Sequence, residues 1–277
     1  QELQCHFSGF LNLRRVGEDL HALVYRVHAG GNADFADCGL VILAAGTNQR
    51  PGETREALLG RNRAILQSIL EQLTAVNRDA VLLVVSNPVD VLTGYTLELS
   101  GFPAERVIGS GTVLDTARIK CLLGEKLGVD SRNVHAFMLG EHGDSEVAVW
   151  SSANISGADL DDFCLAAGID DPESMLASLA REVTHAAYNI IERKGATCYG
   201  IAMAVRRIAE AIIRDEHAVL PVSTLARGAY GIEGVCLGLP AVVGRSGVSR
   251  VLDLPLSRDE TERLLASAHK LKTLMEG

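Results

Sequence analysis

The sequence has few of the features that mark secreted, membrane-bound or nucleic-acid-binding proteins. Its six cysteines lie far apart and form no C-x-x-C pair, so neither a disulfide framework nor a zinc knuckle is expected, and a reducing, cytoplasmic location is predicted. No apolar run reaches the roughly 18 residues of a membrane-spanning helix, and no signal peptide is visible. There is also no run of Lys or Arg, and 35 acidic against 26 basic residues give a net charge of −9. Such a field repels nucleic acid and anionic membrane surfaces, so small molecules are the expected partners.

What the sequence does contain is enough apolar material for a large core. Its 277 residues are 47% hydrophobic and 22% charged, as in one big globular domain or two ordinary ones. In the first part of the chain, apolar runs end at Gly46, at Asn87-Pro88 and at Gly109, and a helical pattern follows each. This alternation predicts a parallel α/β sheet, with its sites at the carboxyl ends of the strands, and the nearly continuous run before Gly46 predicts a strand buried on both faces. The expected strands are residues 26–29, 40–45, 80–86 and 106–109, and the expected helices are 58–73, 89–99 and 113–127.

The pattern changes after about residue 147. Long helices are expected over residues 172–194 and 201–214, and short strands over 218–222, 234–239 and 241–243, with a tight turn at Leu239-Pro240. The last helix, 257–275, opens on a capping box of Ser257 and Glu260. The second half is therefore α+β, and we place the boundary near Gly109, which divides the chain into residues 1–109 and 110–277. Residues 1–24 show no convincing periodicity, apart from 10–13, which are compatible with a strand.

A histidine between two glycines follows the apolar run 134–139. In Gly140-Glu141-His142-Gly143-Asp144, the glycines remove side-chain bulk, so backbone and substrate can approach the imidazole closely. The preceding run predicts a buried strand that holds the loop still. We interpret His142 as a catalytic base with a pKa near 7. Taken alone, this motif would be better explained as a structural turn with a solvated histidine, so the other motifs decide between the two interpretations.

Three other segments carry polar residues at strand ends or in loops. Asn87-Pro88-Val89-Asp90 closes a strand, Asp115 and Arg118 share one face of a helix, and the loop 48–55 combines hinges with a charged tip. Each alone is compatible with a turn, a surface ion pair or a solvated loop. Read in order, however, these segments and the histidine motif closely resemble the L-lactate dehydrogenases of the bacterial type. The resemblance extends from about residue 26 to the end, and the segments that carry it are 44–55, 86–90, 109–118 and 140–144.

The resemblance implies a fold and a reaction. The fold is an incomplete Rossmann-like parallel sheet followed by the α+β C-terminal catalytic domain of the lactate/malate dehydrogenase superfamily. The implied reaction is the NAD-dependent interconversion of pyruvate and L-lactate, with His142 as acid–base catalyst and Asp115 as the carboxylate that orients its imidazole. Arg118 would clamp the substrate carboxylate with its planar guanidinium, and Arg55 would polarise the substrate carbonyl when its loop closes.

Further residues are assigned by the same resemblance. Gln49 stands where malate dehydrogenases carry an arginine for a second carboxylate, so its neutral amide favours pyruvate; malate or another 2-hydroxy acid is the alternative substrate. Lys120 and His135 match an arginine and a histidine that bind fructose 1,6-bisphosphate at a subunit interface, which implies a homotetramer activated weakly by this effector. The remaining implied contacts are Asn87 and Thr197 for the substrate, and Gly46, Thr47, Ser68, Val85, Ser86, Asn87 and Ser110 for NAD.

One departure from the family lies at the N-terminal end. No G-x-G-x-x-G follows a strand there, and no acidic ribose ligand can be placed after it. We therefore expect a truncated chain whose first βαβ unit is missing or scrambled, an open edge at strand 40–45, a separate strand 26–29, and much weaker NADH binding than in a full-length relative. A non-catalytic remnant or assembly-only subunit is the alternative that this departure favours. A metallohydrolase built on His142, Asp144 and Asp115 is disfavoured, because no second histidine stands at ligand spacing, and no metal is expected.

Overall fold

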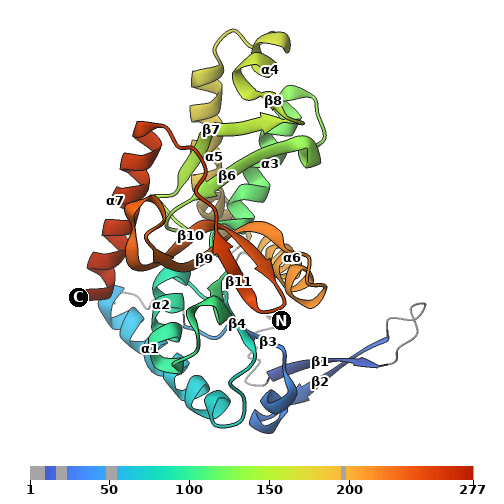
Figure 1. Ribbon diagram of the computed structural model, residues 1–277, viewed down its shortest axis with the longest axis vertical. Coiled ribbons are helices and arrows are strands. Elements are labelled where there is room, and N and C mark those ends of the chain that lie inside the picture. Colours follow the sequence, from blue (N-terminus) through green and yellow to red (C-terminus); the bar gives the residue numbers. More distant parts are fainter. Residues whose placement is uncertain (1–9, 17–23, 48–54, 195–197, 277) are drawn as a thin grey trace.

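The computed structural model describes residues 10–16, 24–47, 55–194 and 198–276. The chain is built on a six-stranded mixed sheet with the order β11-β10-β9-β5-β4-β3 (Figure 1). Its parallel part consists of β3 (Leu40–Leu43), β4 (Val81–Val84) and β5 (Val107–Gly109). An antiparallel meander from the C-terminal half continues the sheet, because Gly109 of β5 pairs with Ser223 of β9. The meander strands are β9 (Ala218–Arg227), β10 (Glu233–Gly244) and β11 (Gly247–Val251).

Helices cover both faces of this sheet. One core contains α1 (Arg55–Thr74), α2 (Val89–Ser100) and α7 (Arg258–Glu276), and the core on the other face contains α6 (Tyr199–Ile213). The side chains of β4 alternate between the two cores: Leu82 and Val84 face the first, and Val81 and Leu83 face the second. A strand whose two faces are both covered needs apolar residues at every position, which explains the continuous run 81–84.

A smaller antiparallel sheet and three helices form a second part of the molecule, drawn above the main sheet in Figure 1. Its strands are β6 (Val134–Leu139), β7 (Val147–Ile155) and β8 (Ala158–Asp159). They share a third core with α3 (Val113–Leu127), α4 (Leu160–Ala166) and α5 (Pro172–Lys194). Four short 3-10 segments, Asn32–Asp37, Ala104–Arg106, Ser131–Asn133 and Ala229–Gly231, connect these elements.

The predicted open edge is confirmed among the described strands. β3 ends the main sheet and pairs there with β4 alone. The expected strand 26–29 belongs to β2 (Val24–Gly30), which pairs antiparallel with β1 (Phe10–Val16) in a separate hairpin that projects from the molecule (Figure 1). The prediction that residues 40–45 are buried on both faces is wrong, because only Val41 and Leu43 are buried and Ile42 is 42% exposed. Val41 and Leu43 face the core that contains α1 and α2. Ile42 faces the other side of the sheet, where α6 leaves this edge strand partly exposed.

The prediction of a tight turn at Leu239-Pro240 is also wrong, because both residues lie inside the long strand β10. Pro240 is paired with Pro221 of β9. The carbonyl of Pro240 accepts a hydrogen bond from Leu252 N, and the carbonyl of Pro221 accepts one from Thr112 N. The nitrogen and carbonyl of a strand residue point to the same side, so both prolines direct their missing N–H away from the β9–β10 ladder. The strand therefore passes through Pro240 without losing a bond to β9.

Two glycines join the main sheet to the smaller one. Gly140, just after β6, exchanges two backbone hydrogen bonds of 2.9 Å with Gly238 of β10. Gly140 has a φ of +93°, and a Cβ there would lie 2.8 Å from Ser267 Oγ, whereas a Cβ at Gly238 would lie 3.0 Å from the Gly140 carbonyl oxygen. Only glycine permits this close approach, which fixes the start of the loop that carries His142.

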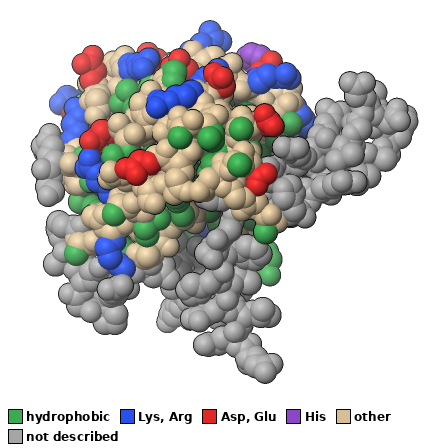
Figure 2. Space-filling model, turned by 90° about the horizontal axis from the view of Figure 1, so that it is seen from below, with side chains coloured by type: hydrophobic (Ala, Val, Ile, Leu, Met, Phe, Trp, Pro, Cys, Tyr) green, Lys and Arg blue, Asp and Glu red, His purple; other side chains and the backbone are tan. Residues whose placement is uncertain are grey.

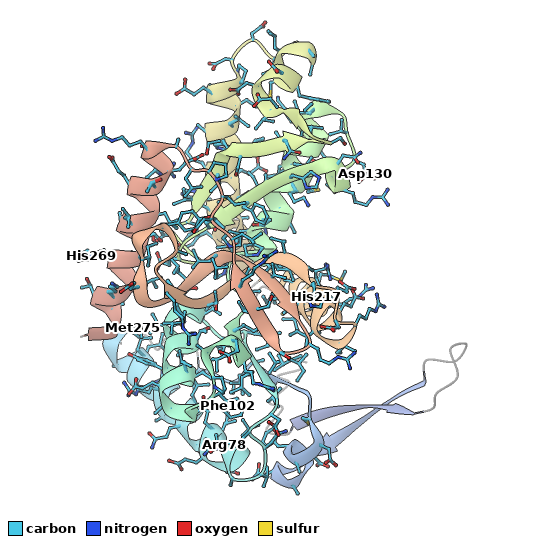
Figure 3. All side chains as sticks on the ribbon, viewed as in Figure 1. Arg78, Phe102, Asp130, His217, His269 and Met275 are labelled. Atoms are coloured by element: carbon cyan, nitrogen blue, oxygen red, sulfur yellow. The ribbon has the colours of Figure 1, made fainter. Side chains whose placement is uncertain are left out.

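Helix α7 is held at both ends. At its C-terminal end, Met275 lies against Gly94 of α2, where a Cβ would come within 2.6 Å of Met275 Cε (Figure 3). At its start, the predicted capping box is confirmed, since Ser257 N donates to Glu260 Oε2 at 2.8 Å and Glu260 N donates to Ser257 Oγ at 3.2 Å. Glu260 also accepts hydrogen bonds from Trp150 N at 2.7 Å and Ser151 N at 3.1 Å. One buried carboxylate therefore joins the start of α7 to β7.

No helix in the described part of the chain is both long enough and apolar enough to cross a lipid bilayer. On the face shown in Figure 2, acidic and basic side chains are interspersed along one rim, and apolar side chains lie among polar ones. A surface of mixed sign does not concentrate a polyanion.

We predict that Glu260→Ala lowers the free energy of unfolding by about 2–4 kcal/mol, because it removes the acceptor of several buried, charge-assisted hydrogen bonds. Urea denaturation monitored by circular dichroism measures this loss. Glu262→Ala is the matched control on the same helix, because Glu262 is exposed and forms a surface ion pair with Arg258. The control is expected to cost less than about 0.5 kcal/mol. Equal losses in the two variants would contradict the role given to Glu260.

Candidate active site

His142 lies in the loop between β6 and β7, residues 140–146, which we call the histidine loop. Hydrogen bonds of its backbone hold this loop in place. Ser267 Oγ of α7 accepts a hydrogen bond of 2.8 Å from Glu141 N, and Asp90 Oδ2 of α2 accepts one of 2.8 Å from His142 N. Together with the pairing of Gly140 and Gly238, these hydrogen bonds attach the loop to three elements, β10, α7 and α2. The backbone of a catalytic residue held in this way keeps its side chain in one orientation.

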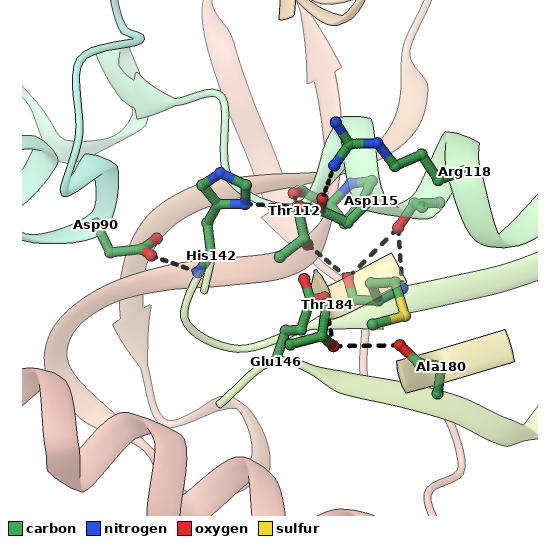
Figure 4. A network of polar contacts seen from close by, with 11 residues as sticks. Asp90, Thr112, Asp115, Arg118, His142, Glu146, Ala180 and Thr184 are labelled. Atoms are coloured by element: carbon green, nitrogen blue, oxygen red, sulfur yellow. Dashed lines mark hydrogen bonds and ion pairs between the residues drawn. The ribbon is translucent and has the colours of Figure 1, made fainter. Parts of the chain in front are cut away.

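A single carboxylate contacts both the imidazole and a guanidinium (Figure 4). Asp115, in the first turn of α3, is 2% exposed. Its Oδ2 lies 2.6 Å from His142 Nδ1, and its Oδ1 accepts a hydrogen bond of 2.8 Å from a terminal nitrogen of Arg118. Because a carboxylate faces Nδ1, that nitrogen carries the ring's proton in the neutral tautomer. The nitrogen left to exchange a proton with a substrate is therefore Nε2.

The surroundings make the imidazole a better proton acceptor than a solvated histidine. Burial lowers the pKa of His142, but the hydrogen bond and the negative charge of Asp115 outweigh burial and raise this pKa from 6.5 to about 9. Asp90 and Glu146 raise it further in the same sense. The expected value near 7 is therefore corrected upward, and His142 of the free protein is protonated at neutral pH.

Two buried acids near His142 were not assigned a role from the sequence. Burial raises the pKa of Asp90 to about 6, and burial followed by the charge of Asp115 raises the pKa of Glu146 to about 8. Each stands beside apolar residues, Asp90 between Val89 and Val91 and Glu146 directly before Val147. A charged residue in such a position is the sequence signal that could have identified both, because isolated charges are rarely buried without a specific use.

The expected cofactor residues follow the carboxyl ends of three neighbouring strands. Gly46 and Thr47 follow β3, Val85 to Asn87 follow β4, and Ser110 follows β5. Backbone hydrogen bonds continue the strand pairing here, from Val85 N to Leu43 O and from Ser110 N to Val84 O. The structure therefore brings these residues to one edge of the sheet, which is where ligands of open parallel sheets bind.

Asn62 of α1 is a further polar residue at this edge that sequence reasoning missed. Its side chain is 1% exposed, and its Oδ1 accepts a hydrogen bond of 2.9 Å from Thr47 N. Its position between Leu59 and Leu66, on the buried face of the helix, is the signal that could have found it. Ser68, one of the expected cofactor residues, lies further along α1 with an exposed side chain.

Several expected site residues lie where the structure gives no side-chain position. Gln49 and Thr197 fall outside the described residues, and the side chain of Arg55, the first residue of α1, is not described. The two expected effector residues are described: Lys120 lies on α3, and His135 lies exposed on the adjacent strand β6. Burial lowers the pKa of Lys120.

Asp115, His142 and Glu146 also place one potential ligand atom each within 4.8 Å of one another, a spacing at which side chains can hold a metal ion. The two Asp115 oxygens, however, are already engaged by His142 Nδ1 and by the cationic Arg118. A guanidinium at this position would repel a bound cation. The arrangement therefore suits an oriented acid–base pair better than a metal centre.

An imidazole oriented by a buried carboxylate, with a guanidinium beside it and a polar sheet edge nearby, can accept a proton from a hydroxyl group and pair with an anionic substrate. This fold and site define a dehydrogenase of the dinucleotide-binding kind. Comparison with protein families agrees: the lactate/malate dehydrogenase NAD binding domain matches residues 18–109, and the lactate/malate dehydrogenase alpha/beta C-terminal domain matches residues 112–277.

Individual relatives are similar over most of their length. The chain is 49% identical to the L-lactate dehydrogenase of Clostridium perfringens over 89% of this chain and 78% of that protein, and 50% identical to that of Streptococcus sanguinis over 94% and 80%. A crystal structure of the minor L-lactate dehydrogenase from Enterococcus mundtii in its ligands-bound form superposes with a TM-score of 0.86 at 43% identity, over 89% of this chain and 78% of that one. The chain belongs to the lactate/malate dehydrogenase family.

We predict that Asp115→Asn lowers the pKa of His142 from about 9, because burial remains while the strongest effect that opposes it, the hydrogen bond and charge of Asp115, is lost. Titration of the imidazole C–H signals by NMR measures this change without any substrate. Asp144→Asn is the control, because Asp144 lies exposed in the same loop and bonds to Tyr188. A midpoint that stays the same in Asp115→Asn would show that Asp115 does not set the protonation of His142.

Proposed function

We propose that the chain is an NAD-dependent L-lactate dehydrogenase that interconverts pyruvate and L-lactate. The observation that carries the proposal is the 2.6 Å contact between His142 Nδ1 and the buried carboxylate of Asp115, with Arg118 on the other oxygen of that carboxylate. The relatives from Clostridium perfringens and Streptococcus sanguinis, which are named L-lactate dehydrogenase, support it. The alternative of a catalytically inactive remnant is disfavoured by a site whose acid–base pair is assembled and buried.

In the proposed reaction, His142 Nε2 receives the hydroxyl proton of L-lactate, and in the reverse direction it returns that proton to the carbonyl oxygen of pyruvate. Asp115 holds the ring in the required tautomer and stabilises the imidazolium that forms. A hydride leaves the carbon atom that bears this hydroxyl group, and NAD, when bound, supplies the acceptor for it. Arg118 pairs with the substrate carboxylate, Asn87 and Arg55 bind the substrate oxygen, and Thr197 lines the methyl pocket.

The residues at the sheet edge fit the nicotinamide side of NAD. Gly46 offers backbone without side-chain bulk, beside Ser86 and Asn62. The Nδ2 atom of Asn62 is buried and has no hydrogen-bond partner among the described residues, so this donor is available to a ligand. We assign Gly46, Thr47, Val85, Ser86 and Ser110 to the nicotinamide and its ribose. The sequence before residue 40 contains no G-x-G-x-x-G, so the pyrophosphate side is not assigned to residues.

Oligomer formation and effector binding follow as parts of the same proposal. Helix α6 exposes Tyr199, Met203 and Ile213, which are 86%, 58% and 66% accessible. Apolar side chains grouped on one exposed helix are suited to a subunit interface, so we propose a homotetramer. Lys120 and His135, on the adjacent elements α3 and β6, are proposed to bind fructose 1,6-bisphosphate. Sedimentation as a monomer, both with and without the effector, would refute both assignments.

A cytoplasmic location is proposed on the chemistry of the cysteines. The five cysteines that the structure describes are free thiols, and Cys121 and Cys198 are exposed. Exposed thiols persist in a reducing compartment, whereas an oxidising one converts them to disulfides or other products. Thiol counting after rapid acid quenching of cells would test this, because extensive oxidation would exclude the proposed location.

We predict that purified protein reduces pyruvate with NADH, that kcat/KM for this reaction falls above about pH 9, and that kcat/KM for lactate oxidation rises over the same range. The signs follow from the pKa of about 9 at His142, since reduction needs the protonated ring and oxidation needs the neutral one.

His142→Asn should lower turnover by about a thousandfold or more. His269→Asn, on the exposed side of α7, is the control (Figure 3). Calorimetric titration with NADH comes first, so that a lack of cofactor binding is separated from a lack of chemistry. Wild-type turnover in His142→Asn would exclude the mechanism.

We also predict that Gln49→Arg shifts the ratio of kcat/KM values from pyruvate toward oxaloacetate by about tenfold or more. The added guanidinium would pair with the second carboxylate of oxaloacetate and would be left unpaired beside the methyl group of pyruvate. Steady-state rates with the two substrates measure the ratio. Gln67→Arg adds the same charge on the exposed side of α1 and should leave the ratio unchanged. If both variants behave alike, Gln49 does not select the substrate.

A further inference from the structure

Glu146 is a buried acid that the proposed reaction does not use. It is the last residue of the histidine loop, directly before β7, and it is 6% exposed. One of its oxygens, Oε1, lies 2.9 Å from Thr184 Oγ1 of α5, and the other, Oε2, is buried without a hydrogen-bond partner among the described residues. The carboxyl group also faces Asp115 and His142, with ligand atoms of the three side chains within 4.8 Å (Figure 4).

The hydrogen bonds of Thr184 indicate where a proton is held. Its hydroxyl lies 2.9 Å from Glu146 Oε1 and 3.2 Å from the carbonyl oxygen of Ala180. A hydroxyl has one proton and cannot donate to both oxygens at once. If Glu146 is protonated, its O–H donates to Thr184 Oγ1, and Thr184 donates to the Ala180 carbonyl. This arrangement satisfies both contacts of the Thr184 hydroxyl; Figure 4 shows the side chains involved.

The charges around the two acids point to the same proton position. Two buried carboxylates this close repel each other, so ionising both is costly. Asp115 has Arg118 and the His142 ring as partners, whereas the described partner of Glu146 is the neutral Thr184 hydroxyl. The proton therefore resides on Glu146 rather than on Asp115. Burial and the charge of Asp115, which raise the pKa of Glu146 to about 8, agree with this assignment.

We propose that Glu146 is a positioning residue of the acid–base pair, holding a proton at neutral pH and, once ionised in alkaline solution, keeping His142 protonated to higher pH. The groups that face it are Asp115 and Arg118 from α3, His142 from its own loop and Thr184 from α5. Its proton passes to solvent and takes no part in hydride transfer. The effect on catalysis rests on the proposed lactate dehydrogenase function, but the protonation of Glu146 does not.

The neutral acid has a physical use in this site. With Glu146 uncharged, Asp115 faces one cationic guanidinium and one imidazole that gains and loses a proton in each turnover. When Glu146 ionises, its negative charge is added beside His142, so deprotonating the imidazolium becomes harder. The pH range over which pyruvate is reduced is thereby extended at its alkaline end.

Infrared difference spectra of wild-type protein against Glu146→Gln test the protonation directly, without substrate or cofactor. At about pH 6, below the range in which a buried acid of this kind ionises, we expect the C=O stretch of a protonated carboxylic acid in the wild type and its loss in Glu146→Gln. Thr184→Val keeps the acid and the shape of the side chain but removes the hydroxyl, so the band should persist at a shifted frequency. This second variant keeps the test decisive if Glu146→Gln does not fold.

The pH profile of pyruvate reduction tests the effect on His142. In Glu146→Gln, the alkaline fall of kcat/KM should move to lower pH by on the order of one unit, because the charge that supports the imidazolium is absent. Glu141→Gln is the matched control, because Glu141 lies in the same loop but is paired with Lys270 at 2.5 Å, and its profile should keep the wild-type midpoint. An ionised Glu146 at about pH 6 or an unmoved midpoint in Glu146→Gln would each overturn the proposal. A protein that shows the acid band but does not reduce pyruvate would instead contradict the proposed function alone.

Discussion

The carboxylate of Asp115 is the contact on which the rest of the site depends. It is almost fully buried, and a charge in that position is tolerable only because Arg118 and His142 bond to its two oxygens. Helix α3, which carries Asp115, is also bonded to β6, the strand before the histidine loop, since Thr116 Oγ1 accepts a hydrogen bond of 2.9 Å from Met138 N. The same helix therefore sets both the position of the histidine and its protonation.

Features decided by local sequence were predictable. The bounds of α3, β6 and α5 agree with the expected ones, because each is set by an apolar period together with a glycine or proline at an end. The capping box at Ser257 needs residues only three positions apart, and it was found for that reason. The pairing of His142 with Asp115 was expected from resemblance to a family, since nothing in the spacing of the two residues requires them to meet.

Features decided by distant partners were not predictable from one sequence. Proline usually marks a turn, but Pro240 lies in a strand because Pro221 of β9 stands opposite it, and the two fit one register. Asp90, Asn62 and Glu146 are polar residues whose use depends on His142, Thr47 and Thr184, which come from other elements. Apolar neighbours in the sequence signal the burial of these residues, but their partners are set by the assembled layers.

The hydrogen bond from Glu141 N to the side-chain oxygen of Ser267 joins residues that are 126 positions apart. Ser267 lies on α7, whereas Asp115, Arg118 and His142 come much earlier in the chain and are synthesised before it. Until α7 has been synthesised, the histidine loop lacks this hydrogen bond, and one face of the main sheet lacks the buried residues Leu264, Ala268 and Leu271. This support of the histidine loop is therefore added late in synthesis, after the residues of the acid–base pair.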